Sequence, residues 1–183
     1  MKTIKVFIAS SEELHEERLA IPYLFQQLNR DLKSKGIAFE PVKWEYLDAS
    51  MGPLHKQEEY NIELKTCEIC IALFWTRFGE YTKSEFETAY HEMLAGRNPR
   101  KLIVYFKDAE EISPDLKVFK DSFATEYGQF FFQFESLKTL RSNIILQLLD
   151  YIRLTDKDLP TVYKSIVEMA IMQDAESNNA RQL

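Results

Sequence analysis

The chain has 183 residues, which is enough for one domain of ordinary size with an appendage but too few for two full domains. Hydrophobic residues make up 45% of it and charged residues 28%, a balance that is typical of folded proteins and excludes an intrinsically disordered chain. The net charge of −6 argues against a nucleic-acid partner, because binding to phosphates requires clustered lysine and arginine.

Strand and helix patterns alternate along the chain. Short apolar runs predict strands at residues 4–8, 37–44, 68–75, 102–106 and 130–134. Amphipathic spacing and turn residues predict the helices between and after them, at residues 10–36 with a kink at Pro22, 56–65, from about 82 to Gly96, 114–127 and 136–152. This alternation predicts an α/β fold: a flavodoxin-like, doubly wound, five-stranded parallel sheet flanked by helices.

The pattern changes after Thr155. Residues 157–160 are typical of a linker, residues 162–172 fit one more helix, and the last residues are polar. We therefore expect a domain at residues 1–152, followed by a linker and C-terminal helical extension at residues 153–183.

No apolar run is long enough to cross a membrane, since a spanning helix needs roughly 20 residues. The N-terminal segment contains an apolar run shorter than the core of a signal peptide, and Glu12 and Glu13 follow it. We therefore expect a cytoplasmic protein without a membrane partner.

Common cofactor and metal signatures do not occur in the sequence. It contains neither the G-x-x-x-x-G-K-[ST] loop nor the G-x-G-x-x-G fingerprint, which argues against a redox cofactor. The three histidines lie far apart and do not have the spacing of a metal site. Cys67 and Cys70 have C-x-x-C spacing, but a zinc site needs a second ligand pair and a redox pair normally opens a helix. We expect no cofactor and no metal.

The junction from Trp75 to Ala89 leads from an apolar strand into a helix whose first turn carries carboxylates. Ligands of open α/β sheets bind outside the carboxyl ends of the strands, so Glu85 and Glu87 are candidates for chemistry there. Spacing alone favours a structural role, because Thr82-x-x-Glu85 and Ser84-x-x-Glu87 both match a helix capping box. The residues alone leave both interpretations open.

Three segments resemble a Toll/interleukin-1 receptor (TIR) domain of the bacterial type. They are the opening Lys5–Ser10, the third predicted strand with its aromatic exit, and Tyr81-x-x-x-Glu85-Phe-x-x-Ala89. The resemblance covers about residues 4–152. In enzymatic members an aromatic-x-x-x-Glu motif, usually with tryptophan first, places the catalytic glutamate at the start of this helix. The resemblance therefore implies that Glu85, rather than Glu87, is catalytic.

Such TIR domains cleave the bond between ribose and nicotinamide in NAD, which is then a substrate rather than a cofactor. The reaction passes through an oxocarbenium-like state that a carboxylate can stabilise, and nicotinamide leaves as a neutral molecule without a general acid. The product is ADP-ribose or a cyclic relative. The residues that we expect to contact the substrate are Tyr81, Ser10, Ser11, Trp44, Phe78 and Arg77.

The resemblance also implies self-association, because residues 45–54 correspond to the loop through which the family commonly assembles. It implies contacts with other TIR domains and a role in immune signalling or antiphage defence. Two other functions stay open: a non-catalytic TIR scaffold for homotypic assembly, and an enzyme similar to the nucleoside deoxyribosyltransferases.

Overall fold

The computed structural model describes residues 1–42, 56–79, 81–128 and 130–155. These residues belong to two compact units, the first from Met1 to Glu135 and the second beginning at Ser136. The predicted loop at residues 45–54 and the predicted helix at residues 162–172 lie outside the described residues, as does Trp44.

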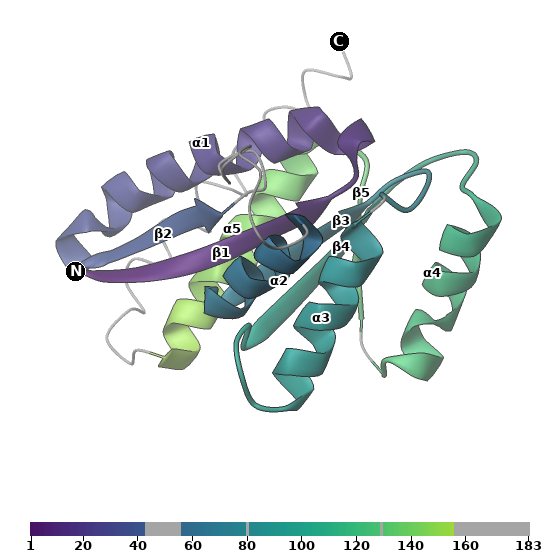
Figure 1. Ribbon diagram of the computed structural model, residues 1–183. Coiled ribbons are helices and arrows are strands. Elements are labelled where there is room, and N and C mark those ends of the chain that lie inside the picture. The colour runs from purple at the N-terminus through teal and green to yellow at the C-terminus, as the bar shows by residue number, and fades with distance from the viewer. Residues whose placement is uncertain (43–55, 80, 129, 156–183) are drawn as a thin grey trace, which may run out of the picture. The chain divides into compact units, whose positions relative to one another are not determined.

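The first unit contains a five-stranded parallel sheet with the strand order β2-β1-β3-β4-β5 (Figure 1). The strands are β1 (Lys2–Ser10), β2 (Ile37–Val42), β3 (Ile69–Phe74), β4 (Lys101–Lys107) and β5 (Phe132–Phe134). The register pairs Ser10 with Leu73, so that β1 and β3 end side by side. This order and the parallel pairing confirm the predicted flavodoxin-like α/β fold.

Helices connect the strands as expected for parallel pairing. They are α1 (His15–Leu32), which follows a 3₁₀ turn at Glu12–Leu14, α2 (Lys56–Thr66), α3 (Thr82–Leu94) and α4 (Pro114–Glu126). A second 3₁₀ turn, Lys33–Lys35, follows α1 and ends at Gly36, whose φ of 69° suits glycine. Helix α5 (Leu137–Thr155) belongs to the second unit.

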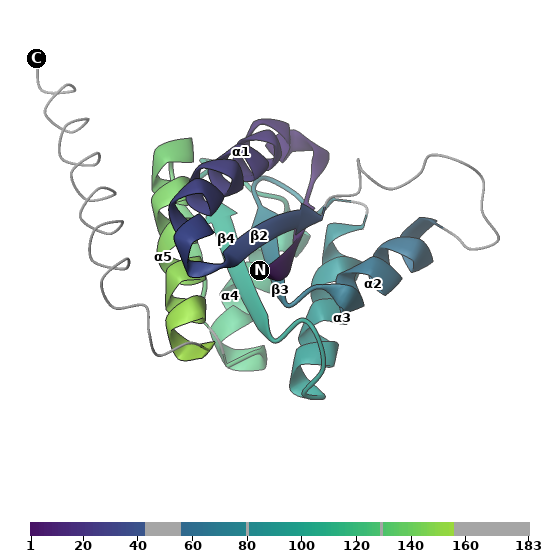
Figure 2. The ribbon, with the colours of Figure 1, turned by 90° about the vertical axis from the view of Figure 1, so that its left-hand side faces the viewer.

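The core of the first unit has two layers, one on each face of the sheet. Helix α1 lies on one side of the sheet, and α2 and α3 lie on the other (Figure 2). Apolar side chains from α2, α3 and α4 pack on their side against alternate residues of the strands, among them Phe7, Cys70, Ala72, Phe74, Val104 and Phe106. Strand β3 is buried along its whole length, which explains its uninterrupted apolar sequence.

Two predicted strands are shorter than their apolar runs. Strand β3 ends at Phe74 rather than at Trp75, and β5 begins at Phe132 rather than at Phe130. The Phe130 side chain is 94% exposed, whereas Phe131 packs against the core cluster on the helical side. A run of aromatic residues therefore did not show which of them pair in the sheet.

The described part of the chain contains no helix with the length and apolar character needed to span a membrane.

Candidate functional site

The strand order reverses direction between β1 and β3, and open α/β sheets place their ligands at such a point. From its end at Ser10, β1 leads to α1 on one face of the sheet. From its end at Phe74, β3 leads to α3 on the other face. The turns after both strands therefore meet at the carboxyl edge, and this edge is the candidate site.

Glu85 is a buried carboxyl group at this edge. Its side chain is 4% exposed, and its backbone N–H donates to the Tyr81 carbonyl at 2.9 Å in the first turn of α3. Burial raises the pKa of Glu85 to about 7, and the positive charge of Arg18 opposes this rise. The carboxyl group can therefore exchange a proton near neutral pH.

The structure contradicts both capping boxes. The residue at the N-cap of α3 is Tyr81, and no side-chain hydrogen bond caps the helix there. Thr82 is already the first helical residue, so α3 begins earlier than either box requires. A capping box needs the hydroxyl residue at the N-cap itself, which places both Thr82 and Ser84 out of position. Glu85 is therefore not a capping residue.

Glu87 has an ordinary surface environment. Its side chain is exposed and forms an ion pair with Lys83 at 3.9 Å, one helical turn away. Such exposed pairs contribute little to stability. Glu87 is therefore a matched control for Glu85 on the same helix.

Arg18 places a buried positive charge at the site, which the sequence analysis missed. Its side chain is 1% exposed. Nη1 donates to Ser10 Oγ at 2.9 Å and to the Ser11 carbonyl at 3.1 Å. Nη2 lies 3.4 Å from His15 Nδ1. The signal in the sequence was its position between Leu14 and Ile21, on the apolar stripe of α1.

Glu13 joins the turn after β1 to the loop after β3, and it was also missed. Its Oε1 accepts from the backbone N–H groups of Thr76 and Arg77, at 3.0 and 3.3 Å, and from Ser11 Oγ at 3.1 Å. Its Oε2 accepts from the Thr76 hydroxyl. One carboxylate thus fixes the start of the loop that leads to Glu85.

Gly79 allows the same loop to approach the backbone of Ser11. A Cβ atom at Gly79 would lie 2.8 Å from Ser11 Cα and 2.5 Å from Thr82 Oγ1. Real Cβ atoms do not come this close to other heavy atoms. Only glycine fits here without moving either the turn after β1 or the start of α3.

Ser10 and Ser11, both predicted to contact the substrate, have buried side chains with internal partners. The Ser10 hydroxyl accepts from Arg18, and the Ser11 hydroxyl donates to Glu13. Both residues lie at the candidate site, but their hydroxyl groups form hydrogen bonds within the protein, with Arg18 and Glu13. Their contact with a substrate stays a prediction.

The other predicted substrate contacts differ in how much of each side chain is exposed to solvent. Tyr81 is 43% exposed at the start of α3. Phe78 is half-buried and makes edge-on contacts with Phe74 and Phe119, with ring centroids 5.8 and 5.2 Å apart. Arg77 is exposed on the same loop. The structure thus brings Tyr81, Phe78 and Arg77 to the same edge as Glu85.

Trp75, at the exit of β3, is held by β4. Lys107 Nζ lies 3.9 Å from the centroid of its ring, and the indole N–H donates to the Asp108 carbonyl at 3.2 Å. Lys107 also pairs with the buried Glu17 of α1 at 2.7 Å. These contacts join the exit of β3 to β4 and to α1.

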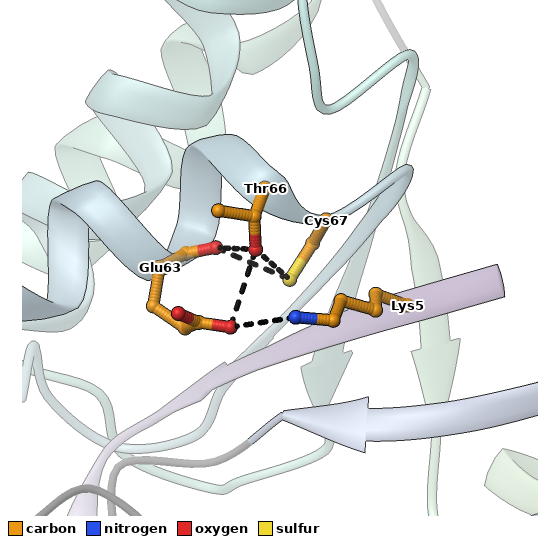
Figure 3. A network of polar contacts seen from close by, with 4 residues as sticks. All are labelled: Lys5, Glu63, Thr66 and Cys67. Carbon is orange, nitrogen blue, oxygen red and sulfur yellow. Dashed lines mark hydrogen bonds and ion pairs between the residues drawn. The ribbon is translucent and has the colours of Figure 1, made fainter. Parts of the chain in front are cut away.

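The cysteines belong to the core. Cys67 Sγ donates to the Glu63 carbonyl at 3.4 Å, and Lys5 Nζ contacts the Glu63 carboxylate at 3.1 Å (Figure 3). Burial raises the pKa of Cys67 to about 12 and that of Cys70 well above its ordinary value. Thiols in such surroundings are poor nucleophiles at neutral pH. Within the described ranges, no group of three or more histidine, cysteine, aspartate or glutamate side chains is arranged to hold a metal ion.

Two cavities lie beside α3 and α4, away from Glu85. One of about 550 Å³ is lined by residues that include Phe78, Lys83 and Val118. The other, of about 270 Å³, is lined by residues that include Phe86, Arg100 and Phe130. Neither Glu85 nor Arg18 lines them, and Phe78 is the residue that the larger cavity shares with the candidate site.

No protein-family model matches the chain, and no curated protein sequence matches it. The resemblance to TIR domains therefore depends on the motifs in the sequence alone.

Proposed function

We propose that the chain is an NAD⁺ glycohydrolase of the TIR type and that Glu85 is its catalytic carboxylate. The observation that carries this proposal is the burial of Glu85 at the point where the strand order reverses. Burying an ionisable group is costly, and the helix gains no cap in return. Carboxyl groups with such perturbed pKa values cluster at functional sites.

The reaction breaks the bond between C1′ of the ribose and the pyridine nitrogen of nicotinamide. The electron pair of this bond goes to nicotinamide, which leaves as a neutral molecule, and a positive charge develops on the ribose. The ionised form of Glu85 stabilises this charge in the transition state. Water then adds to C1′ and loses a proton, which a carboxylate with a pKa of about 7 can accept. The products are nicotinamide, ADP-ribose and a proton.

A cyclic product forms by the same first step. If an adenine nitrogen attacks C1′ in place of water, the ADP-ribose chain closes into a ring. Assembly through residues 45–54 and a role in signalling or defence complete the proposal, on the family resemblance alone.

The test measures nicotinamide release from NAD by chromatography, for the wild type, Glu85→Gln and the control Glu87→Gln. The assay is run with concentrated protein, with a crowding agent and on a multimerising support, because TIR domains commonly act as assemblies. We expect Glu85→Gln to lose about 100-fold or more, the usual scale for removing a transition-state charge contact. Glu87→Gln should stay within about twofold of the wild type, since its ion pair is exposed.

Three outcomes would contradict the proposal. If the wild type releases no nicotinamide under any of these conditions, the non-catalytic scaffold is favoured. If Glu85→Gln retains full activity, Glu85 is not the catalytic carboxylate. If the protein cleaves deoxynucleosides but not NAD, the deoxyribosyltransferase-like enzyme is favoured.

A further inference from the structure

Arg18 is a buried cation whose position is fixed by the end of β1. Arginine is almost never fully buried unless it is paired, and here Ser10 and Ser11 together accept two hydrogen bonds from Nη1. Its charge does not depend on pH in the physiological range. The site thus contains a constant positive charge.

A continuous set of contacts joins Arg18 to the turn that holds Glu85. The Ser11 carbonyl accepts from Arg18, and the Ser11 backbone lies against Gly79. Gly79 in turn lies against the Thr82 hydroxyl, in the first turn of α3, and Glu85 follows in that turn. Arg18 and Glu85 are therefore two buried ionisable groups on turns that contact each other, although they come from helices on opposite faces of the sheet.

We propose that Arg18 is a positioning residue whose guanidinium favours the ionised form of Glu85. Burial favours the neutral carboxylic acid, whereas the guanidinium favours the carboxylate. Without the guanidinium only the effect of burial remains, and a larger fraction of the carboxyl group is protonated at pH 7.

Other charged groups nearby do not replace Arg18. Cys70 lies close enough to interact with Glu85, but burial holds the pKa of its thiol well above the ordinary value and keeps it neutral. Lys83, on α3 itself, is exposed and pairs with Glu87. His15 contacts the guanidinium through Nδ1, at 3.4 Å from Arg18 Nη2. Glu13 binds the loop after β3.

The test follows the carboxyl carbon of Glu85 by ¹³C NMR as the pH is raised. The variants are Arg18→Gln, which removes the charge but keeps hydrogen-bonding groups, and the control Arg30→Gln at the exposed end of the same helix. We expect the midpoint of the Glu85 titration to rise by roughly one pH unit or more in Arg18→Gln, because a nearby opposite charge changes a carboxyl pKa by about this much. It should not move in Arg30→Gln. An unchanged midpoint in Arg18→Gln would overturn the proposal.

Because Arg18→Gln can fail to fold, two further measurements use proteins that keep the positive charge at position 18. In Arg18→Lys the midpoint should stay near that of the wild type, and a rise as large as that expected for Arg18→Gln contradicts the proposal. In the wild type, the guanidinium ¹⁵N shifts of Arg18 should change at the Glu85 midpoint, and this change should vanish in Glu85→Gln. If the shifts show no such change, Arg18 does not sense Glu85.

The catalytic consequence rests on the proposed function. If the carboxylate is the active form, a midpoint one unit higher lowers kcat/KM about fivefold at pH 7 and hardly at all at pH 9. A purely structural role would lower kcat/KM at both pH values, which would overturn the proposal. If NAD is not cleaved but the midpoint still shifts, the proposed function fails and the coupling between Arg18 and Glu85 stands.

Discussion

At the scale of single residues, Glu85 and Glu87 show how environment separates two identical side chains. Glu87 lies in solvent beside Lys83, and Glu85 lies in the interior, where the charge of Arg18 acts on it. The burial of Glu85 lowers the stability of the fold whenever its carboxyl group has to be ionised. A neutral side chain of the same shape does not have this cost.

The pH dependence of unfolding follows from the same residue. The pKa of Glu85 is about 7 in the folded state and about 4.5 when unfolded, so the folded protein holds the proton more tightly. Its contribution to the free energy of unfolding is fully present below pH 4.5 and is lost as the pH rises to 7. Relative to Glu85→Gln, the wild type should therefore lose roughly 3 kcal/mol between pH 4.5 and pH 8.

Urea unfolding of the wild type, Glu85→Gln and Glu87→Gln at several pH values measures this difference. The curve of Glu87→Gln should run parallel to that of the wild type, because its carboxyl group is exposed. A constant difference between the wild type and Glu85→Gln would show that Glu85 titrates normally in the folded protein.

At the scale of elements, the candidate site depends on how the loop after β3 meets the turn after β1. Glu13 binds the first residues of this loop, and Gly79 brings its later part against Ser11. Together these contacts set where α3 begins. A carboxylate and a glycine from distant parts of the sequence thus determine the position of Glu85.

Replacing Gly79 by alanine tests this dependence. The new Cβ atom collides with backbone and side-chain atoms, so we expect a loss of about 1–3 kcal/mol in the free energy of unfolding. The midpoint of Glu85 should also move, because α3 shifts. Gly96→Ala is the control: its φ of 70° makes alanine unfavourable, but no atom lies in the way. It should lower stability without changing the Glu85 midpoint.

The sheet and its helices could be predicted from the sequence, whereas the hydrogen bonds of the candidate site could not. The apolar runs of β1, β3 and β4 and the spacing on α3 predicted the sheet and its helices, because burial on both faces leaves an uninterrupted local pattern. The capping boxes were wrong because the motif has no information about where a neighbouring turn forces the helix to begin. Arg18 and Glu13 were missed because their partners are not set by local spacing. The carboxyl edge itself was predictable, but its hydrogen bonds were not.

At the scale of the whole molecule, stability should be uneven across the sheet. Strand β3 lies between two partners and is buried throughout, whereas β5 is a three-residue edge strand with two exposed side chains. Elements with few buried contacts open locally without global unfolding. We therefore expect the central strand β3, which leads to the candidate site, to be better protected than β5.

Amide hydrogen exchange measures this difference within one sample. We expect the amides of β3 to exchange more slowly than those of β5 by at least about 100-fold, because β3 opens only when the domain unfolds. Similar protection in the two strands would show that the sheet opens as a single unit.

The two buried cysteines can report local opening of the structure. Cys67 lies at the end of α2 and Cys70 in β3, and both thiols are inaccessible in the folded chain. An alkylating reagent can therefore reach each sulfur only when its surroundings separate. Pulse labelling followed by mass spectrometry distinguishes opening at the end of α2 from opening of the central strand, without an engineered label.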